Sequence, residues 1–243
     1  MTPQALVTGG TRRVGRAIAL ELARAGFDLV VTWRRDAEGA RRVTDEVRAL
    51  GRACRAMRLD LASVREPASA RALLGLDRLD ALVLSAASWE ATAWGSVDAD
   101  AMADALQVNA IAPVVLAQAA QPLLAASALP GGGSVVAVGD AHAGDIPVRG
   151  FAAYLMSKAA LAQAVRQMAA EMAPAVRVNG VLPGVVDWPE SIDAARREAI
   201  LARIPLARAG EPADVARLVR FLCLEATFMT GALVPVDGGR SIR

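Results

Sequence analysis

The sequence predicts an α/β fold, a doubly wound parallel sheet of about seven strands with helices on both faces. Two observations predict this fold. Short apolar runs alternate with longer amphipathic stretches along all 243 residues, as in repeated strand–helix units. No change in composition and no linker divides the chain, so we expect one domain over residues 1–243. Ligands of such sheets bind at the carboxyl ends of the strands, so residues that follow strands are the first candidates for a site.

The expected strands are short and apolar, and cover residues 4–7, 28–33, 54–59, 81–85, 134–138, 176–181 and 232–236. The expected helices lie between them and include residues 16–26, 38–51 and 152–172, where apolar residues recur every three to four positions. Gly26 and Gly51 fit the ends of the first two helices. The stretch LPGGGS at residues 129–134 predicts a turn that leads into the fifth strand.

Composition excludes several classes of function. The net charge is only +2 and basic and acidic residues are interspersed, which argues against a nucleic-acid partner. The two cysteines, Cys54 and Cys223, are too few and too far apart for a disulfide scaffold or a structural zinc site, and we expect no metal. The most apolar stretch, residues 110–126, contains two glutamines and two prolines, so we expect no membrane span. The first strand begins almost at the first residue, which leaves no room for a signal peptide and predicts a cytoplasmic protein.

The stretch TGGTRRVG, residues 8–15, follows the first strand and precedes a helix. Gly9 and Gly15 bracket this turn, where glycines allow positive φ and let a pyrophosphate approach backbone N–H groups at the helix start. Arg13 stands where a phosphate-binding loop usually has a middle glycine. An ordinary tight turn is the alternative interpretation of the two glycines.

The end of the second strand indicates which dinucleotide binds. A fold that prefers NAD has an acidic residue there, which accepts hydrogen bonds from the ribose hydroxyls. Here Trp33, Arg34 and Arg35 take that place, and guanidinium groups suit the 2′-phosphate of NADP(H). Asp36 follows too late for the ribose and could pair with an arginine. We expect NADPH as cofactor, with a solvated cluster of surface charges as the alternative.

Tyr154 is the only tyrosine in the chain, and Lys158 follows it by four positions in YLMSK. On a helix these two side chains share a face, so the ammonium lies near the phenol. A nearby cation lowers the pKa of a tyrosine, which suits a general acid that works near neutral pH.

At this point the sequence resembles the short-chain dehydrogenase/reductase family over essentially its whole length. The matching segments are TGGTRRVG (8–15), RLDLA (58–62), LVLSAAS (82–88), VNAIAP (108–113), YLMSK (154–158), NGVLPG (179–184) and GALVPVDGG (231–239). The resemblance implies a Rossmann-type fold and hydride transfer, with Asn109 supporting a water that relays protons to Lys158. It also implies that Asp60 and Leu61 border the adenine, and that Lys158 holds the nicotinamide ribose.

The full set of cofactor-binding residues that we expect comes from the loops after the strands. It comprises Gly9, Thr11, Arg12, Arg13, Val14, Trp33, Arg34, Arg35, Asp60, Leu61, Ser85, Ala86, Ala87, Tyr154, Lys158, Pro183, Gly184, Val185 and Val186.

Three departures from the common family pattern concern the substrate. Arg13 replaces the middle glycine, Asp140 stands where the catalytic serine is expected, and Trp89 follows a segment that reads LSAAS instead of the usual N-N-A-G. Together they resemble the pteridine reductase and dihydromonapterin reductase branch, as does the closing VDGGRSIR. This resemblance implies that the substrate is a dihydropterin or dihydrofolate that is reduced to the tetrahydro form.

The chemistry expected for that branch is coherent. An aromatic ring can stack on one face of a flat pterin, and a carboxyl can pair with its ring nitrogens or deliver a proton. The expected catalytic residues are Asp140, Tyr154, Lys158 and Asn109. The expected substrate-binding residues are Arg13, Trp89, Asp140, Tyr154, Trp188 and Arg243.

Several alternatives stay open. The interval from Asp140 to Tyr154 is one residue longer than in that branch, although Asp140 follows the apolar strand directly and is favoured over Asp145. His142 is more readily interpreted as a solvated loop residue than as a catalytic one. The alternative function is an NADPH-dependent reductase of the same family that acts on a carbonyl, such as a 3-oxoacyl thioester or a ketone. A catalytically idle NADP(H) binder is a third possibility. The family resemblance also implies a homotetramer.

Overall fold

The computed structural model describes residues 2–143, 146–188 and 192–242. Seven parallel strands form one sheet in the order β3-β2-β1-β4-β5-β6-β7. The strands are β1 Gln4–Thr8, β2 Asp28–Trp33, β3 Cys54–Arg58, β4 Ala81–Leu84, β5 Gly133–Val138, β6 Val176–Pro183 and β7 Leu233–Val236. The order reverses after β1, which gives the doubly wound arrangement expected from the sequence.

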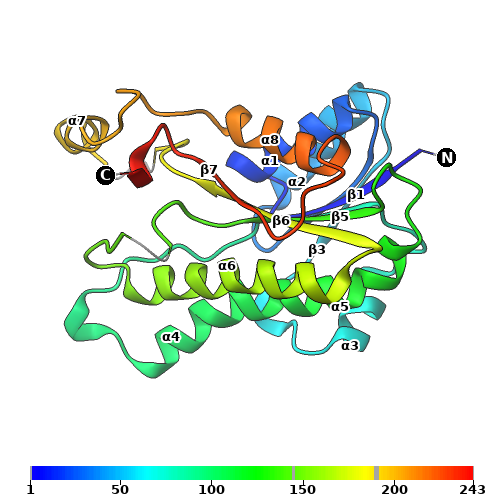
Figure 1. Cartoon of the computed structure of the whole chain (residues 1–243), viewed down its shortest axis with the longest axis horizontal. Helices are drawn as coiled ribbons and strands as arrows, with labels where there is room; N and C mark the ends of the chain where they lie inside the picture. Colours follow the sequence, from blue (N-terminus) through cyan, green and yellow to red (C-terminus); the bar gives the residue numbers. More distant parts are fainter. Residues whose placement is uncertain (1, 144–145, 189–191, 243) are drawn as a thin grey trace.

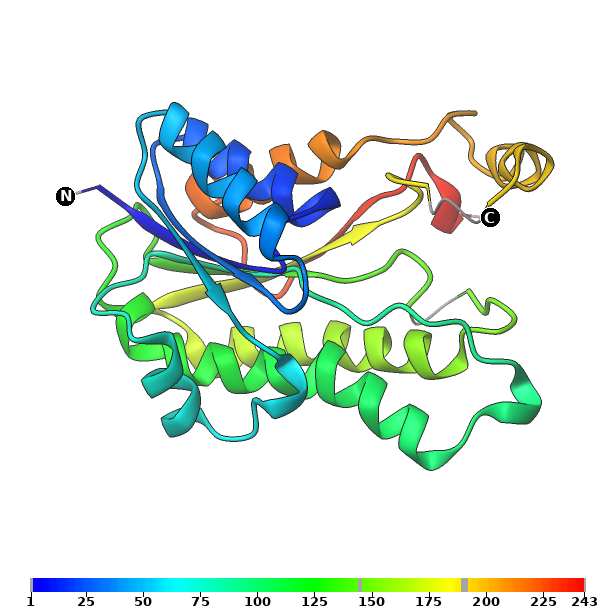
Figure 2. The same cartoon turned by 180° about the vertical axis from the view of Figure 1, so that it is seen from behind.

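Helices cover both faces of this sheet, as Figures 1 and 2 show. The helices are α1 Arg13–Arg24, α2 Ala37–Ala49, α3 Pro67–Leu74, α4 Ala99–Leu106, α5 Ala112–Ala125, α6 Ala152–Met172, α7 Ala194–Leu201 and α8 Pro212–Leu224. Short turns are η1 Leu61–Ser63, η2 Trp94–Ser96, η3 Gln107–Ile111 and η4 Arg240–Ile242. Helices α1, α2 and α8 lie on one face, and α3, α4, α5 and α6 lie on the other (Figure 1). The α/β class, the parallel sheet and the two helical layers are therefore confirmed.

The core has two halves, one on each side of the sheet. Successive residues of a strand point to opposite faces, so Leu6 of β1 joins one half while its neighbours Ala5 and Val7 join the other. All of these side chains are buried. Burial on both faces explains why the strands read as continuous apolar runs and not as alternating ones.

The boundaries of several elements differ from the expected ones. Helix α1 begins at Arg13 and not at Arg16, because Arg12 already takes the extended conformation of an N-cap. Strand β6 continues to Pro183, beyond the expected end at residue 181, because β7 pairs with it as far as that proline. Gly26 and Gly51 follow the ends of α1 and α2 with φ of 97° and 74°, as expected for helix stops.

Helices α4 and α5 are joined by η3, a short π-helical segment. Together residues Ala99–Ala125 form a helix that is long and apolar enough to cross a membrane by length and composition alone. More than half of its most apolar window, 56%, is buried inside the fold. Its apolar composition fits a core helix, because α5 packs against α3 and α6 and against the sheet.

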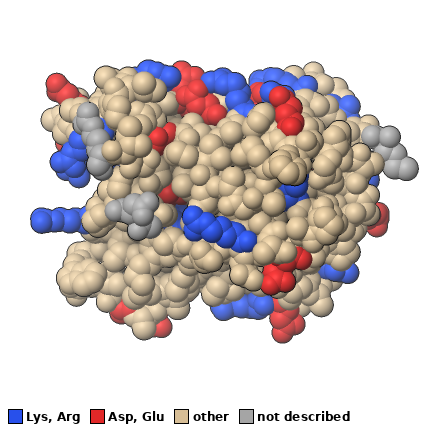
Figure 3. Space-filling model, in the orientation of Figure 1, with Lys and Arg blue, Asp and Glu red and all other residues tan. Residues whose placement is uncertain are grey.

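The surface in Figure 3 has basic and acidic side chains interspersed, with large areas of other residues between them. On this face the basic side chains are not gathered into one patch of the kind that binds a nucleic-acid backbone.

Candidate active site

The loop after β1 is shaped by two glycines that no other residue can replace without a shift of the backbone. Gly9 has φ of 65°, and a Cβ there would lie 2.9 Å from the Cα of Ala86. A Cβ on Gly15 would clash with the carbonyl oxygen of Gly9. Thr8 ties this loop to the one after β4, because its Oγ1 accepts from the amides of Ser85 and Ala86 at 3.0 and 3.1 Å. Side chains larger than hydrogen are thus excluded at Gly9 and Gly15, which leaves the backbone of this loop open to a ligand as a pyrophosphate would require.

Arg13 adopts φ of 49° at the first position of α1, a conformation that favours glycine. Its Nε lies 2.9 Å from Oδ2 of Asp187, and both side chains are substantially exposed. Asp187 belongs to the loop after β6 and was missed by the sequence analysis. The ion pair therefore joins the first loop to the loop after β6, where Asp187 directly follows the expected cofactor-binding residue Val186.

The end of β2 exposes both arginines that were assigned to the 2′-phosphate. Arg34 and Arg35 are exposed and Trp33 is half-buried. Asp36 does not pair with either arginine. It caps α2 by accepting from the amide of Gly39 at 2.9 Å, and it accepts from the hydroxyl of Thr11 at 3.2 Å. The pairing with an arginine that was left open for Asp36 gives way to a different role, because its carboxylate serves as the N-cap of α2.

The expected catalytic residues meet at the carboxyl end of β5. The hydroxyl of Tyr154 donates to Oδ2 of Asp140 at 2.9 Å. One turn along α6, the Nζ of Lys158 lies 5.9 Å from the centre of the tyrosine ring and donates to the carbonyl of Val138 at 2.8 Å. Tyr154 and Lys158 are both buried. The shared helix face expected for the pair is present, and the carboxylate of Asp140 contacts the Tyr154 hydroxyl.

His142 belongs to this group. Oδ1 of Asp140 accepts from the backbone amide of His142 at 2.8 Å and lies 3.1 Å from its ring nitrogen Nδ1. The imidazole is largely buried, with 13% of its side chain exposed. The interpretation of His142 as a solvated residue is wrong, because the turn that follows β5 folds it back onto Asp140. The lone histidine directly after a strand end was the available signal.

The pKa values of Asp140, Tyr154 and Lys158 are shifted by burial and by their contacts, and the shift of Tyr154 differs from the expected one. Burial raises the pKa of Asp140, but hydrogen bonds from His142 and Tyr154 outweigh it, and the pKa lies below its usual value. Burial and the charge of Asp140 raise the pKa of Tyr154 above its usual value. Burial lowers the pKa of Lys158 to about 8. The expected net lowering of the Tyr154 pKa is thus wrong here, because burial and, after it, the Asp140 carboxylate raise that pKa.

Asn109 lies in the π-helical segment η3 and faces this group from the neighbouring helix. Its side-chain amide donates to the carbonyl of Ser88 and to Oγ of Ser157, both at 2.9 Å, and its oxygen accepts from the amide of Ser88 at 2.8 Å. Ser157 lies between Tyr154 and Lys158 in sequence. The side chain of Asn109 therefore fixes the loop after β4 against α6, and the water relay stays a prediction.

Two aromatic residues, Trp89 and Phe151, form a chain of ring contacts that ends on Tyr154. Trp89 is about half exposed, at 49%, and its ring lies 5.1 Å from that of Phe151, which packs edge-on to Tyr154 at 6.4 Å. Trp188 follows β6, and the guanidinium of Arg197 lies 5.5 Å from its ring. Arg243, the other expected substrate-binding residue, lies outside the described residues, as does Asp145.

The remaining expected cofactor residues also follow strand ends. Asp60 and Leu61 follow β3, and Asp60 caps η1 through its carboxylate. Gly184 follows β6, and a Cβ there would lie 2.8 Å from the Cα of Asp237. A hollow of about 630 Å³ adjoins this loop, lined by Val185, Pro205, Leu206, Arg208, Gly210, Asp214, Pro235, Val236, Asp237, Gly238, Gly239 and Ile242.

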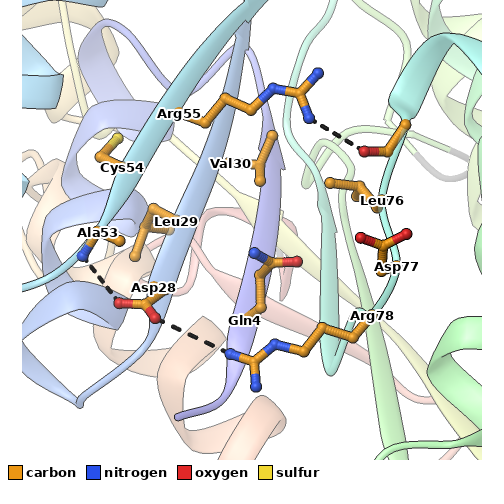
Figure 4. Close-up of a pocket in the computed structure, with 11 residues that line it drawn as sticks. Gln4, Asp28, Leu29, Val30, Ala53, Cys54, Arg55, Leu76, Asp77 and Arg78 are labelled. Carbon is orange, nitrogen blue, oxygen red and sulfur yellow. Dashed lines mark hydrogen bonds and ion pairs between the residues drawn. The ribbon is translucent and has the colours of Figure 1, made fainter.

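A second cavity, of about 430 Å³, lies at the opposite edge of the sheet (Figure 4). It includes Gln4, Asp28 and Cys54, the first residues of β1, β2 and β3. Asp28 accepts from Arg52 and from the amide of Ala53. This cavity is at the amino ends of the strands, so the catalytic group has no part in it.

The comparison with protein families shows to which family the chain belongs. Residues 9–241 match the family model described as enoyl-(acyl carrier protein) reductase. The chain belongs to the short-chain dehydrogenase/reductase family. A 3-oxoacyl-[acyl-carrier-protein] reductase of Aggregatibacter actinomycetemcomitans is 32% identical over 98% of this chain and 99% of its own.

Solved structures of short-chain dehydrogenases/reductases agree with this assignment. An acetoin dehydrogenase of Salmonella typhimurium is 29% identical, with a TM-score of 0.88 over 100% of this chain and 97% of its own. The RhlG protein of Pseudomonas aeruginosa, solved as an active-site complex with NADP, is 33% identical, with a TM-score of 0.85 over 98% of this chain and 96% of its own.

The names of the relatives in the short-chain dehydrogenase/reductase family show which substrates those proteins use. They comprise reductases of oxoacyl groups and dehydrogenases of ketones or alcohols, and no pteridine reductase is among the relatives that the comparisons name. The family is therefore as expected from the sequence, whereas the pteridine reductase branch has no support from the relatives.

Proposed function

We propose that this protein is an NADPH-dependent reductase of a carbonyl group, either in a ketone or in a 3-oxoacyl thioester. The observation that carries the proposal is the buried Tyr154–Lys158 pair at the carboxyl end of β5. It is supported by relatives that act on oxoacyl groups and on ketones or alcohols, and by a structural relative described with NADP. This is the function that the sequence analysis held as the alternative to pterin reduction.

The residues present fit the cofactor. The glycine cradle at Gly9 and Gly15 accepts a pyrophosphate, and Arg34 and Arg35 are exposed where the 2′-phosphate of the adenosine ribose would lie. When bound, NADPH supplies a hydride. Tyr154 then orients the carbonyl oxygen and gives it a proton, and the Nζ of Lys158 lies 5.9 Å from the centre of its ring on the same helix face.

Pterin reduction remains a second candidate because of one observation. Asp140 is a carboxyl at the place of a serine, and its hydrogen bonds hold it in the ionised form that pairs with the N–H groups of a pterin. Arg13 gives this candidate less support, because it is paired with Asp187. An idle binder is disfavoured, since binding alone does not require Tyr154, Lys158 and Asn109 together.

One assay separates the three candidates. NADPH oxidation is followed with a 3-oxoacyl thioester, simple ketones, a dihydropterin and a dihydrofolate, each with the same enzyme sample. Turnover of a thioester or a ketone supports the proposal. Turnover of the dihydropterin alone, with competition by diaminopteridine antifolates, would replace it by pterin reduction. Binding of NADPH without turnover of any of these compounds would show that the protein binds the cofactor but does not catalyse their reduction.

A further inference from the structure

Every hydrogen bond that the structure gives the side chain of Asp140 brings a donor to its carboxylate. Oδ1 receives the amide and the ring of His142, and Oδ2 receives the hydroxyl of Tyr154. The carboxyl group is largely buried, with 19% of its side chain exposed. Lys158 and Arg240 add positive charge nearby without a hydrogen bond to it from either side chain among the described residues. Asp140 is thus held as an anion that acts only as an acceptor.

In carbonyl reduction, Asp140 and the carbonyl oxygen of the substrate compete for the same donor, the hydroxyl of Tyr154. Tyr154 has one hydroxyl proton, and in the structure it goes to Oδ2 of Asp140. To orient a carbonyl, the hydroxyl must turn away from the carboxylate. Among the described residues Oδ2 then has no other donor, and it faces the carbonyl oxygen as a second acceptor. A buried, charged acceptor without a donor is costly. A serine at this position would avoid the conflict, because its hydroxyl can also donate.

We propose that the substrate resolves this conflict itself, by carrying a hydroxyl on the carbon next to its carbonyl. This inference rests on the proposed function and specifies its substrate class as 2-hydroxyketones. The substrate hydroxyl donates to Oδ2 of Asp140 while Tyr154 donates to the carbonyl oxygen. The oxygens of Tyr154 and Asp140 lie 2.9 Å apart, side by side, so a donor and an acceptor on adjacent carbons can meet both. A 3-oxoacyl thioester has no donor on the carbon next to its keto group.

The reaction balances with the co-reactant of the proposed function. Hydride from NADPH adds to the carbonyl carbon, and the proton of Tyr154 goes to the carbonyl oxygen. The product is a vicinal diol, in which the hydroxyl bound by Asp140 is unchanged. The phenolate that is left on Tyr154 takes a proton from solvent before the next turnover. Asp140 transfers no proton and acts by selecting the substrate.

The test is a matched pair of substrates. 3-Hydroxybutan-2-one and 3-methylbutan-2-one differ only in a hydroxyl against a methyl on the carbon beside the carbonyl. We expect kcat/KM to favour the hydroxyketone by about tenfold to a hundredfold, the range for one hydrogen bond to a buried charged acceptor. In Asp140→Ser this ratio falls toward one. Glu90→Ser, which removes an exposed carboxylate from the loop after β4, keeps the wild-type ratio.

Asp140→Asn provides a second variant of nearly the same shape, and NADPH binding measured by fluorescence shows that each variant is folded. We expect the ratio to fall in Asp140→Asn as well, because its amide also offers a donor. A wild-type ratio near one overturns the inference while the carbonyl reductase function stands. A high ratio that Asp140→Ser and Asp140→Asn leave intact overturns it too. Failure of both ketones and of the oxoacyl thioester, with reduction of a dihydropterin, overturns the proposed function and the inference together.

Discussion

The hydroxyl of Tyr154 donates to Oδ2 of Asp140 at 2.9 Å, so the proton expected to reach the substrate is held by a neighbouring carboxylate. The family resemblance implies a serine in that position, which can donate as well as accept. A carboxylate in place of the serine has two effects. It raises the pKa of Tyr154, and it creates an acceptor that the substrate must satisfy.

Tyr154→Phe should nearly abolish turnover and leave the Kd for NADPH close to the wild-type value. The change removes the proton donor but leaves the ring and Lys158 in place. Steady-state kinetics and a fluorescence titration on the same sample check the two parts. Turnover close to that of the wild type would assign proton delivery to Asp140 instead.

His142→Ala should move the acidic limb of the kcat/KM profile for the hydroxyketone to higher pH. Asp140 must be ionised to accept the substrate hydroxyl, and activity is lost as pH falls through its pKa. Hydrogen bonds from His142 lower that pKa, so removal of the imidazole raises it and the loss begins at a higher pH. The backbone donor of residue 142 is retained in this variant, which limits the shift.

His142→Asn is the matched control, because its amide nitrogen can donate to Oδ1 of Asp140 where Nδ1 lies. We expect its acidic limb to lie closer to that of the wild type. If His142→Ala and the wild type share one pH profile, the contact between His142 and Asp140 is structural only.

NADPH should bind more tightly than NADH by at least about tenfold in Kd, the scale of one or two charge-assisted contacts. The reason is the exposed pair Arg34 and Arg35 at the end of β2, together with the use of Asp36 as a helix cap. Arg34→Ala combined with Arg35→Ala should remove most of the preference. Arg166→Ala, an exposed arginine of α6, is the control. Equal affinities of the wild type for the two cofactors would show that the cluster is a solvated surface.

Much of the fold could be predicted from the sequence because parallel strands buried on both faces leave a strong apolar pattern, as in ALVLS after the third crossover. The proximity of Asp140 to Tyr154 and Lys158 could be anticipated because Asp140 follows a strand end and the other two share a helix face. Asn109 was assigned from the family resemblance alone. The contact of His142 with Asp140 could not be predicted, because it depends on a tight turn in a loop that has no periodic pattern. The ion pair of Arg13 with Asp187 could not be predicted either, because the two residues come from loops that are distant in sequence. The substrate branch was inferred from three isolated positions, which chance substitution can also produce.

The protein should form a homotetramer, as the family resemblance implies. Ile111 of η3 and Met156 of α6 are about half exposed, at 46% and 51%, on the helical layer that covers one face of the sheet. Apolar residues left on such a layer favour association. Light scattering at micromolar protein measures the mass directly, and a monomer that persists across a concentration series would contradict the prediction.

The last prediction concerns Lys158, which is the only lysine in the sequence. Burial lowers its pKa to about 8, from 10.5 in the unfolded chain. The folded protein therefore releases this proton first, and between these two pH values the unfolded state binds more protons. Stability must then rise with pH over this window as the cost of the buried charge disappears. Below about pH 8 both states are protonated, and the cost is present in full.

Lys158→Met removes this titration while keeping an unbranched side chain of similar length. The free energy of unfolding of the wild type, relative to the variant, should therefore increase by about 3 kcal/mol between pH 7 and pH 10.5. Urea unfolding at several pH values in this range measures the difference. Tyrosine and cysteine titrations in the unfolded chain are common to both proteins, so they cancel in the comparison. The Val138 carbonyl loses its donor in the variant at every pH, which shifts the whole curve but not its slope. A difference that stays constant with pH would mean that Lys158 keeps an ordinary pKa despite its burial.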